Sequence, residues 1–152
     1  MSSGSRYAVS IHILAYLAYR GGILVPSKEI AASVATNPVV VRRLLSVLVR
    51  AQLVRARKGT TGGFELAQPA RAISLLAIYR AVEPAPNLGL NRFAPNHRCP
   101  IGAKIEEVLQ GLFARAQASM EVELARVTLA DVSDQLQSVC PKQKKTPTAT
   151  SS

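Results

Sequence analysis

The side chains with the clearest chemical potential in this sequence are cations gathered in one short stretch. They include Arg42, Arg43, Arg50, Arg57 and Lys58. Guanidinium groups bind phosphate oxygens and guanine edges through paired hydrogen bonds. Residues 30–64 contain no acid, whereas a solvated helix face normally mixes both signs. The stretch therefore predicts a surface that binds a polyanion, and an ordinary solvated face is the alternative.

The charge of the whole chain supports this interpretation. The 152 residues include 19 Lys or Arg against 9 Asp or Glu, a net charge of +10, while 48% of the residues are hydrophobic. Such a chain can bury a core and is not a disordered basic tail. Residues 1–72 carry ten of the cations and two acids, and residues 73–140 carry six and seven. We expect the first half to contact the polyanion and the second half to have another task.

Other classes of protein fit poorly. Two cysteines are too few for a disulfide scaffold, and the uncharged runs are shorter than a membrane span. We expect a cytoplasmic protein that does not bind a membrane. The acids form no paired-carboxylate pattern, and neither His12 nor His97 has a Ser/Asp arrangement beside it, so we expect no enzyme.

The cations of residues 38–51 fall on one face of an expected helix. Helical spacing predicts helices over residues 5–19, 28–34 with Ser27 as N-cap, and 38–51 with Asn37 as N-cap and Pro38 at the first position. The third helix has a buried stripe of Val41, Leu44, Leu45 and Leu48, opposite Val39, Arg42, Arg43, Ser46 and Arg50. Two short helices with an arginine face predict a helix-turn-helix whose second helix fits a DNA major groove.

A hairpin follows the helices. Residues 52–57 alternate apolar and polar side chains, which predicts a strand. Residues 63–66 are expected to pair with it as a second strand, and the Gly-rich residues 58–62 form the turn. The turn lacks the Gly-x4-Gly-Lys-Ser/Thr pattern of a nucleotide-binding loop. We therefore expect a β-wing whose tip reaches phosphates or the minor groove.

The second half predicts a helix for contact with another chain. Ser74 caps a helix over residues 75–82, residues 83–100 form a loop, and Thr128 and Asp131 form a capping box for a closing helix. Between these lies an apolar stripe longer than one small domain can cover: Ile105, Val108, Leu109, Leu112, Phe113, Ala116 and Met120. The expected fold is mainly α with a small β-wing: a winged helix-turn-helix domain (1–83), a loop carrying Cys99 (84–102), a dimerisation helix and closing helix (103–139) and a disordered tail (140–152).

Several motifs together resemble the Rrf2 family of bacterial winged-helix transcription regulators. They are Ser5-Arg6-Tyr7-Ala8-Val9, Thr36-Asn37-Pro38-Val39-Val40-Val41-Arg42-Arg43, Gly59-Thr60-Thr61-Gly62-Gly63-Phe64, Ile73-Ser74-Leu75-Leu76 with Tyr79-Arg80-Ala81-Val82, and Cys99-Pro100-Ile101-Gly102. The second and the last look closest to the YwnA-like branch. The resemblance implies a homodimer on a pseudo-palindromic operator in double-stranded DNA, expected to act as a repressor.

The resemblance implies which parts contact DNA. They are the start of the helix over residues 38–51, called the reading helix, and the tip of the wing. With neighbouring positions, the expected DNA-binding residues are Ser27, Lys28, Asn37, Val39, Val40, Arg42, Arg43, Ser46, Arg57, Lys58 and Gly59. Two alternatives remain open. One is a dimeric scaffold or adaptor that has lost its operator, and the other is a non-specific DNA-binding protein.

The cysteines depart from the pattern of cluster-binding relatives, which carry three closely spaced cysteines. Here the loop holds only Cys99, and Cys140 lies far away. We expect no iron–sulfur cluster, no metal and no cofactor, because a cluster usually takes four protein ligands. His97, Arg98 and a nearby helix start predict a lowered thiol pKa at Cys99. Cys99 is then either a redox sensor, through which the regulator responds to an oxidant or small molecule of unknown identity, or a structural loop cysteine.

Overall fold

A computed structural model describes residues 3–83, 85, 88–90 and 93–140 of the chain. The helices and strands of this part are α1 (Ser3–Tyr19), α2 (Ser27–Val34), α3 (Pro38–Arg50), β1 (Val54–Arg57), β2 (Gly63–Leu66), a 3-10 turn (Ala70–Ala72), α4 (Leu75–Val82), α5 (Ile105–Arg126) and α6 (Leu129–Val139). The mainly helical fold with one small antiparallel hairpin confirms the expected class. The expected tail beyond Cys140 lies outside the described residues.

The hydrophobic core lies among α1 to α4, β1 and the start of α6. Its fully buried side chains include Ile13, Leu14, Ile30, Leu45, Leu48, Ile73, Ile78 and Leu129. The stripe predicted for α3 is part of it: Val41, Leu44, Leu45 and Leu48 are all buried. Since burying one such aliphatic side chain contributes about 1.5–3 kcal/mol, this stripe fixes which face of α3 points inward.

Polar caps set where the helices begin. The side chain of Ser74 accepts a hydrogen bond from the N–H of Ala77, and Thr128 forms the predicted capping box with Asp131. The prediction that Ser27 caps α2 was wrong. Pro26 occupies that position, its extended backbone carbonyl accepts the N–H groups of Glu29 and Ile30, and Ser27 becomes the first helical residue.

The hairpin starts later than predicted. Residues 52 and 53 are not in the strand, because Gln52 adopts the left-handed conformation (φ 59°) that ends α3. The N–H of Leu53 then reaches back to the carbonyl of Leu48 at 3.0 Å, and the N–H of Gln52 to that of Val49. These two bonds form a Schellman motif. It turns the chain from the helix into β1.

The hairpin is anchored to the helices by a residue far away in sequence. Val25 exchanges two backbone hydrogen bonds of 2.9 Å with Phe64 of β2. A Cβ on Gly63 would lie only 2.8–2.9 Å from the backbone of Val25. Glycine is therefore required at position 63, and the wing is fixed to the segment that leads into α2.

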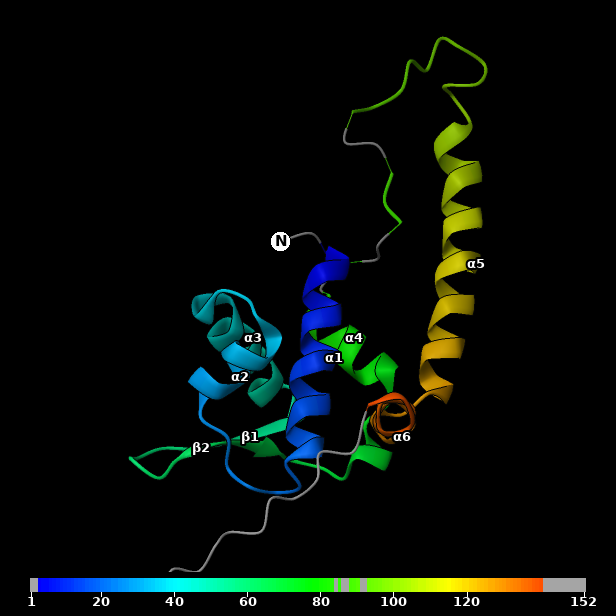
Figure 1. Cartoon of the computed structure of the whole chain (residues 1–152). Coiled ribbons are helices and arrows are strands. Elements are labelled where there is room, and N and C mark those ends of the chain that lie inside the picture. The colour runs from blue at the N-terminus through cyan, green and yellow to red at the C-terminus, as the bar shows by residue number, and fades with distance from the viewer. Residues whose placement is uncertain (1–2, 84, 86–87, 91–92, 141–152) are drawn as a thin grey trace, which may run out of the picture.

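The last two helices leave and then rejoin this body (Figure 1). Figure 1 shows α5 on the side of the molecule opposite α2, α3 and the hairpin, with its N-terminal turns standing away from the other helices. The bridge between Ser74 and Thr128 brings the chain back, with Leu75 N–H bonded to Val127 and Leu129 N–H to Ile73. This bridge buries Leu129 in the core.

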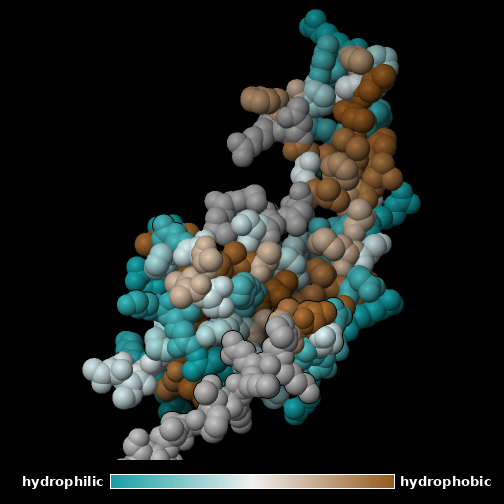
Figure 2. Space-filling model, in the orientation of Figure 1, coloured by the Kyte–Doolittle hydropathy of each residue, from teal (hydrophilic) through white to brown (hydrophobic). Residues whose placement is uncertain are grey.

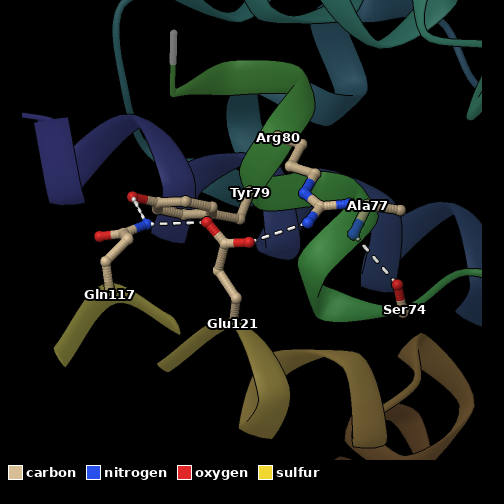
Figure 3. Close-up of polar contacts among 6 residues, drawn as sticks. All are labelled: Ser74, Ala77, Tyr79, Arg80, Gln117 and Glu121. Carbon is tan, nitrogen blue, oxygen red and sulfur yellow. Dashed lines mark hydrogen bonds and ion pairs between the residues drawn. The ribbon is translucent and has the colours of Figure 1, made fainter. Parts of the chain in front are cut away.

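A small polar network joins α5 to α4 (Figure 3). Gln117 of α5 donates to the hydroxyl of Tyr79 (3.2 Å) and to Glu121 (3.0 Å), whose carboxylate also pairs with Arg80 at 2.8 Å. Tyr79 also packs edge-on against Tyr7 of α1, with ring centroids 5.4 Å apart. Burial, reinforced by Tyr79, raises the pKa of Tyr7 to about 12. The network links α5 to α4 and, through Tyr79, to α1.

Among the described residues, no single helix is long and apolar enough to span a membrane. The pair α2 and α3 reaches the necessary length and composition only together, and it is bent by 113°.

Candidate nucleic-acid interface

The geometry of α2 and α3 is that of a helix-turn-helix. The axes of the two helices meet at 113°, and three residues connect them. The first of these, Ala35, has a left-handed backbone (φ 52°), and the last, Asn37, caps α3 by accepting the N–H of Val39 at 2.8 Å. This turn lets α2 support α3 while one face of α3 stays open.

The open face of α3 carries the predicted residues. Val39, Arg42, Arg43, Ser46 and Arg50 are all exposed. The hydroxyl of Ser46 donates to the carbonyl of Arg42 at 3.0 Å, so its oxygen keeps acceptor capacity. Val40 differs from the others, because it is half-buried and packs against the core. This face combines hydrogen-bond donors with one exposed apolar side chain, the chemistry that reads base edges.

A shallow hollow of about 380 Å³ lies between α2 and α3. Its lining comes from both helices and from the turn: Ser27, Lys28, Ala31, Ala32, Thr36, Pro38 and Arg42. The predicted residues Ser27 and Lys28 are therefore brought next to Arg42, although 14 positions separate Lys28 from Arg42 in the sequence.

The one acid of the helix-turn-helix is engaged by α1. Glu29 accepts a 2.6 Å hydrogen bond from the hydroxyl of Tyr16 and forms an ion pair with Arg20. Arg20 also lies 5.9 Å from the centre of the Tyr16 ring. These contacts tie Glu29 to the supporting helix, so the positive charge of Lys28, Arg42 and Arg43 is left on the open side.

The wing tip adds a second group of cations. Arg57, Lys58 and Gly59 are all exposed, and Gly59 has a positive φ of 109° within the turn. The hairpin and α3 lie on the same side of the molecule in Figure 1. The predicted DNA-binding residues of the helix and of the wing are thus carried by one side of the fold.

The opposite side of the molecule presents the apolar stripe of α5. Val108, Leu112 and Ile105 are exposed (56%, 46% and 36%), Ala116 is exposed too, and Leu109, Phe113 and Met120 are half-buried. Figure 2 shows this hydrophobic surface along the upper part of α5. No residue of α5 is buried. An exposed apolar surface of this kind on a helix is typical of a contact with another chain.

Comparison with known proteins identifies the family. A model of the Rrf2 family, described as iron-dependent transcriptional regulators, matches residues 1–135. This chain belongs to the Rrf2 family. It is thus a transcriptional regulator of the DNA-binding winged-helix type, as the motifs of the sequence predicted. Regulators of this kind are not enzymes, which agrees with the expectation drawn from the acids and histidines.

Individual relatives of this Rrf2 protein agree with the assignment. It is 43% identical over 132 residues to YwnA of Bacillus subtilis, which is named as an HTH-type transcriptional regulator. The matched residues cover 87% of this chain and 97% of YwnA. A crystal structure described as a DNA-binding protein is 41% identical, with a TM-score of 0.68 over 84% of this chain and 97% of its own. A transcriptional regulator from Lactobacillus plantarum is 29% identical, with a TM-score of 0.76 over 87% and 89%.

The donor atoms of this Rrf2 protein do not fit an iron–sulfur cluster. The whole chain has two cysteines, and both are exposed and free. Among the described residues, no group of three or more His, Cys, Asp or Glu side chains is placed to hold a metal ion. A cluster needs four protein ligands, mostly thiolates, so the iron dependence in the family's description has no matching site in these residues.

The loop before α5 holds Cys99 in a tight turn. The N–H of Cys99 bonds to the carbonyl of Asn96, and a Cβ on Gly102 would collide with that same carbonyl, so glycine is required there. Backbone N–H groups of Gly102 and Ile101 hold the pKa of the Cys99 thiol below its ordinary value. The low pKa was predicted from His97, Arg98 and the nearby helix start. The groups responsible are backbone donors in the turn that leads into α5, and neither His97 nor Arg98 is among them.

Sequence reasoning missed two residues of the wing surface. Arg55 and Glu65 lie directly opposite each other in the hairpin register. The alternation of β1 already places Arg55 on the same strand face as Arg57, so period-two spacing was the signal that could have found it. The partnership with Glu65 depends on the register, which the sequence pattern left open.

Proposed function

We propose that this Rrf2 regulator binds a pseudo-palindromic operator in double-stranded DNA as a homodimer and represses transcription from it. One winged helix would occupy each half-site, with α3 in the major groove and the wing tip on the adjacent backbone or minor groove. The observation that carries the proposal is the open face of α3, where Arg42, Arg43 and Arg50 are exposed beside the basic wing tip. We expect the protein to act on DNA in the cytoplasm.

The contacts divide by chemistry. Arg42 and Arg43 are proposed to read guanine edges, since a guanidinium donates to O6 and N7 together. Val39 and Val40 would contact thymine methyl groups or pack at the groove, and Ser46 would offer its oxygen to a base donor. The remaining proposed contacts go to phosphates: Ser27, Lys28, Asn37, Arg57, Lys58 and Gly59.

Dimerisation is proposed through α5, with residues 103–139 as the dimerisation unit, residues 1–83 as the DNA-binding domain and residues 84–102 as the connection. The support is the uncovered apolar stripe from Ile105 to Met120. Such a dimer would present two copies of α3 to the duplex. Half-sites about 34 Å apart, or a multiple of that distance, would then match one helical turn of DNA.

We further propose that a signal reaches the regulator through the loop at Cys99. The Cys99 thiol is exposed, and its lowered pKa favours the thiolate, which is the form that reacts with oxidants. Cys99→Ser should abolish any effect of hydrogen peroxide on operator binding, and Cys140→Ser should preserve it. If peroxide leaves the wild-type affinity unchanged, Cys99 is a structural residue of the turn.

The deciding experiment is selection of bound fragments from a library of bacterial genomic DNA, followed by titration in a salt series. The proposal expects enrichment of a palindromic sequence and an affinity that falls steeply as salt rises, by a slope of about 0.9 for each phosphate neutralised. Salt-dependent binding without enrichment would instead assign a non-specific DNA-binding protein. An absence of binding at any salt concentration would favour the scaffold or adaptor.

A further inference from the structure

Glu65 of the wing lies between two arginines of the neighbouring strand. One of its carboxylate oxygens is 3.5 Å from a terminal nitrogen of Arg55 and 3.9 Å from Nε of Arg57. The side chain of Glu65 is only 14% exposed, whereas those of Arg55 and Arg57 are 58% and 64% exposed. A mostly covered carboxylate therefore sits beneath two arginines that extend into solvent.

This placement leaves the two arginines able to bind phosphates, while the carboxylate lowers the net positive charge of the wing. Arg57 faces Glu65 with Nε, so both terminal nitrogens of its guanidinium stay available for a phosphate. The positive charges of the wing come from Arg55, Arg57 and Lys58, and Glu65 is the one acid in residues 30–82. It cancels one of three positive charges at a place where charge alone attracts any DNA.

We propose that Glu65 is a positioning residue that limits non-specific DNA binding by the wing. It holds Arg55 and Arg57 on one face of the hairpin and removes one positive charge from the attraction to arbitrary phosphates. The wing contacts phosphates on the operator as well, so Glu65 lowers the affinity for both kinds of DNA and leaves discrimination between sequences to α3. This inference rests on the proposed function, because it concerns the DNA affinity of the same surface.

The test compares three substitutions in the full chain. Glu65→Gln keeps the size and the hydrogen-bond acceptor but removes the charge, and Glu65→Asp keeps the charge. Glu123→Gln is the matched control, since Glu123 also pairs with an arginine (Arg126, 3.4 Å) but lies on α5. Binding to a random-sequence duplex and to the selected operator is measured by fluorescence anisotropy over a salt series, and thermal unfolding shows that each variant is folded.

Glu65→Gln should bind the random duplex more tightly, with a salt slope steeper by about 0.9 per subunit, the value of one more neutralised phosphate. At 0.1 M salt this slope corresponds to about an eightfold gain. The affinity for the operator should rise by a similar factor, because the wing contacts phosphates there too, while E65D and E123Q should stay close to wild type.

The inference is overturned if Glu65→Gln matches wild type on the random duplex, because the pair then serves only the hairpin. It is also overturned if Glu123→Gln steepens the slope equally, since net charge alone would explain the effect. If wild type and all variants bind no duplex DNA, the proposed function fails and this inference fails with it. The slope on random DNA decides the matter even where no operator is selected.

Discussion

The side-chain oxygen of Asn37 accepts the backbone N–H of Val39 at 2.8 Å and so closes the first turn of α3. The residue at the proposed DNA-facing end of the reading helix is therefore also its cap. Asn37→Ala removes the cap and should lower the free energy of unfolding by about 1 kcal/mol. Denaturation in urea measures this loss, and operator affinity should fall together with it.

Asn37→Asp separates the two roles of this position. Aspartate is also a good cap, and its charge suits a helix N-terminus, so stability should stay near that of wild type. The same charge would face the phosphates of DNA and should weaken binding to operator and random duplex alike. Equal DNA affinity of Asn37→Asp and wild type would show that this end of α3 does not approach DNA.

Arg42 and Arg43 should contribute specificity more than general affinity. Both side chains are exposed, and no ion pair engages either of them within the described residues. Replacing either by alanine should cost about 1–3 kcal/mol on the operator and little on random DNA. Titrations with both duplexes test this, with Arg115→Ala on α5 as the control. Equal losses on both duplexes would assign these arginines to phosphates.

The junction of α4 and α5 should depend on pH through Glu121. Hydrogen bonds from Gln117 and Arg80 hold the pKa of Glu121 below its ordinary value of 4.5, so the folded state favours the charged form. Its stabilising contribution is then present above the unfolded pKa and is lost as the pH falls through the lower folded pKa. Glu121→Gln should lower Tm at pH 7, and the difference should shrink below a pH of about 4.

A double-mutant cycle with Arg80→Gln is the control for this prediction. If Glu121 acts through Arg80, the effect of Glu121→Gln on Tm should be smaller once Arg80 has been replaced. A difference in Tm between wild type and Glu121→Gln that is the same at all pH values would contradict the assignment.

The Schellman turn after α3 contains a residue that glycine should improve. Gln52 has φ 59°, which is costly for a residue with a Cβ, whereas Ala51 just before it has an ordinary φ of −78°. Gln52→Gly should raise the free energy of unfolding by about 0.5–1 kcal/mol, and Ala51→Gly should lower it by a similar amount. Urea denaturation of both variants measures the two changes in the free energy of unfolding. Changes of the same sign would contradict the prediction.

Local patterns account for what the sequence predicted well. The Asn37-Pro38 start, the four buried residues of α3, the Ser74 cap and the capping box at Thr128 all depend on neighbours within one or two helical turns. Such signals are readable because each cap or stripe residue acts on its own helix. The mainly helical fold and the exposed arginine face followed from them.

Contacts between distant segments account for what the sequence left out. The pairing of Val25 with Phe64 and the bridge from Ser74 to Thr128 join residues far apart in the chain. Neither produces a periodic pattern. The left-handed Gln52 was also unforeseen, because glutamine has no preference for that conformation. The pairing of Glu65 with the wing arginines depends on strand register in the same way.

The exposed stripe of α5 gives the sharpest test of the proposed dimer. Leu112 lies in the middle of the stripe with 46% of its surface exposed, so a glutamate there should be tolerated by the isolated fold but would bury a charge in a dimer. Leu112→Glu should therefore be monomeric in sedimentation equilibrium and should bind a palindromic operator more weakly than wild type. Ala118→Glu adds the same charge at an exposed position on the other side of α5 and should remain dimeric. A dimer of unchanged strength in Leu112→Glu would move the interface away from this stripe.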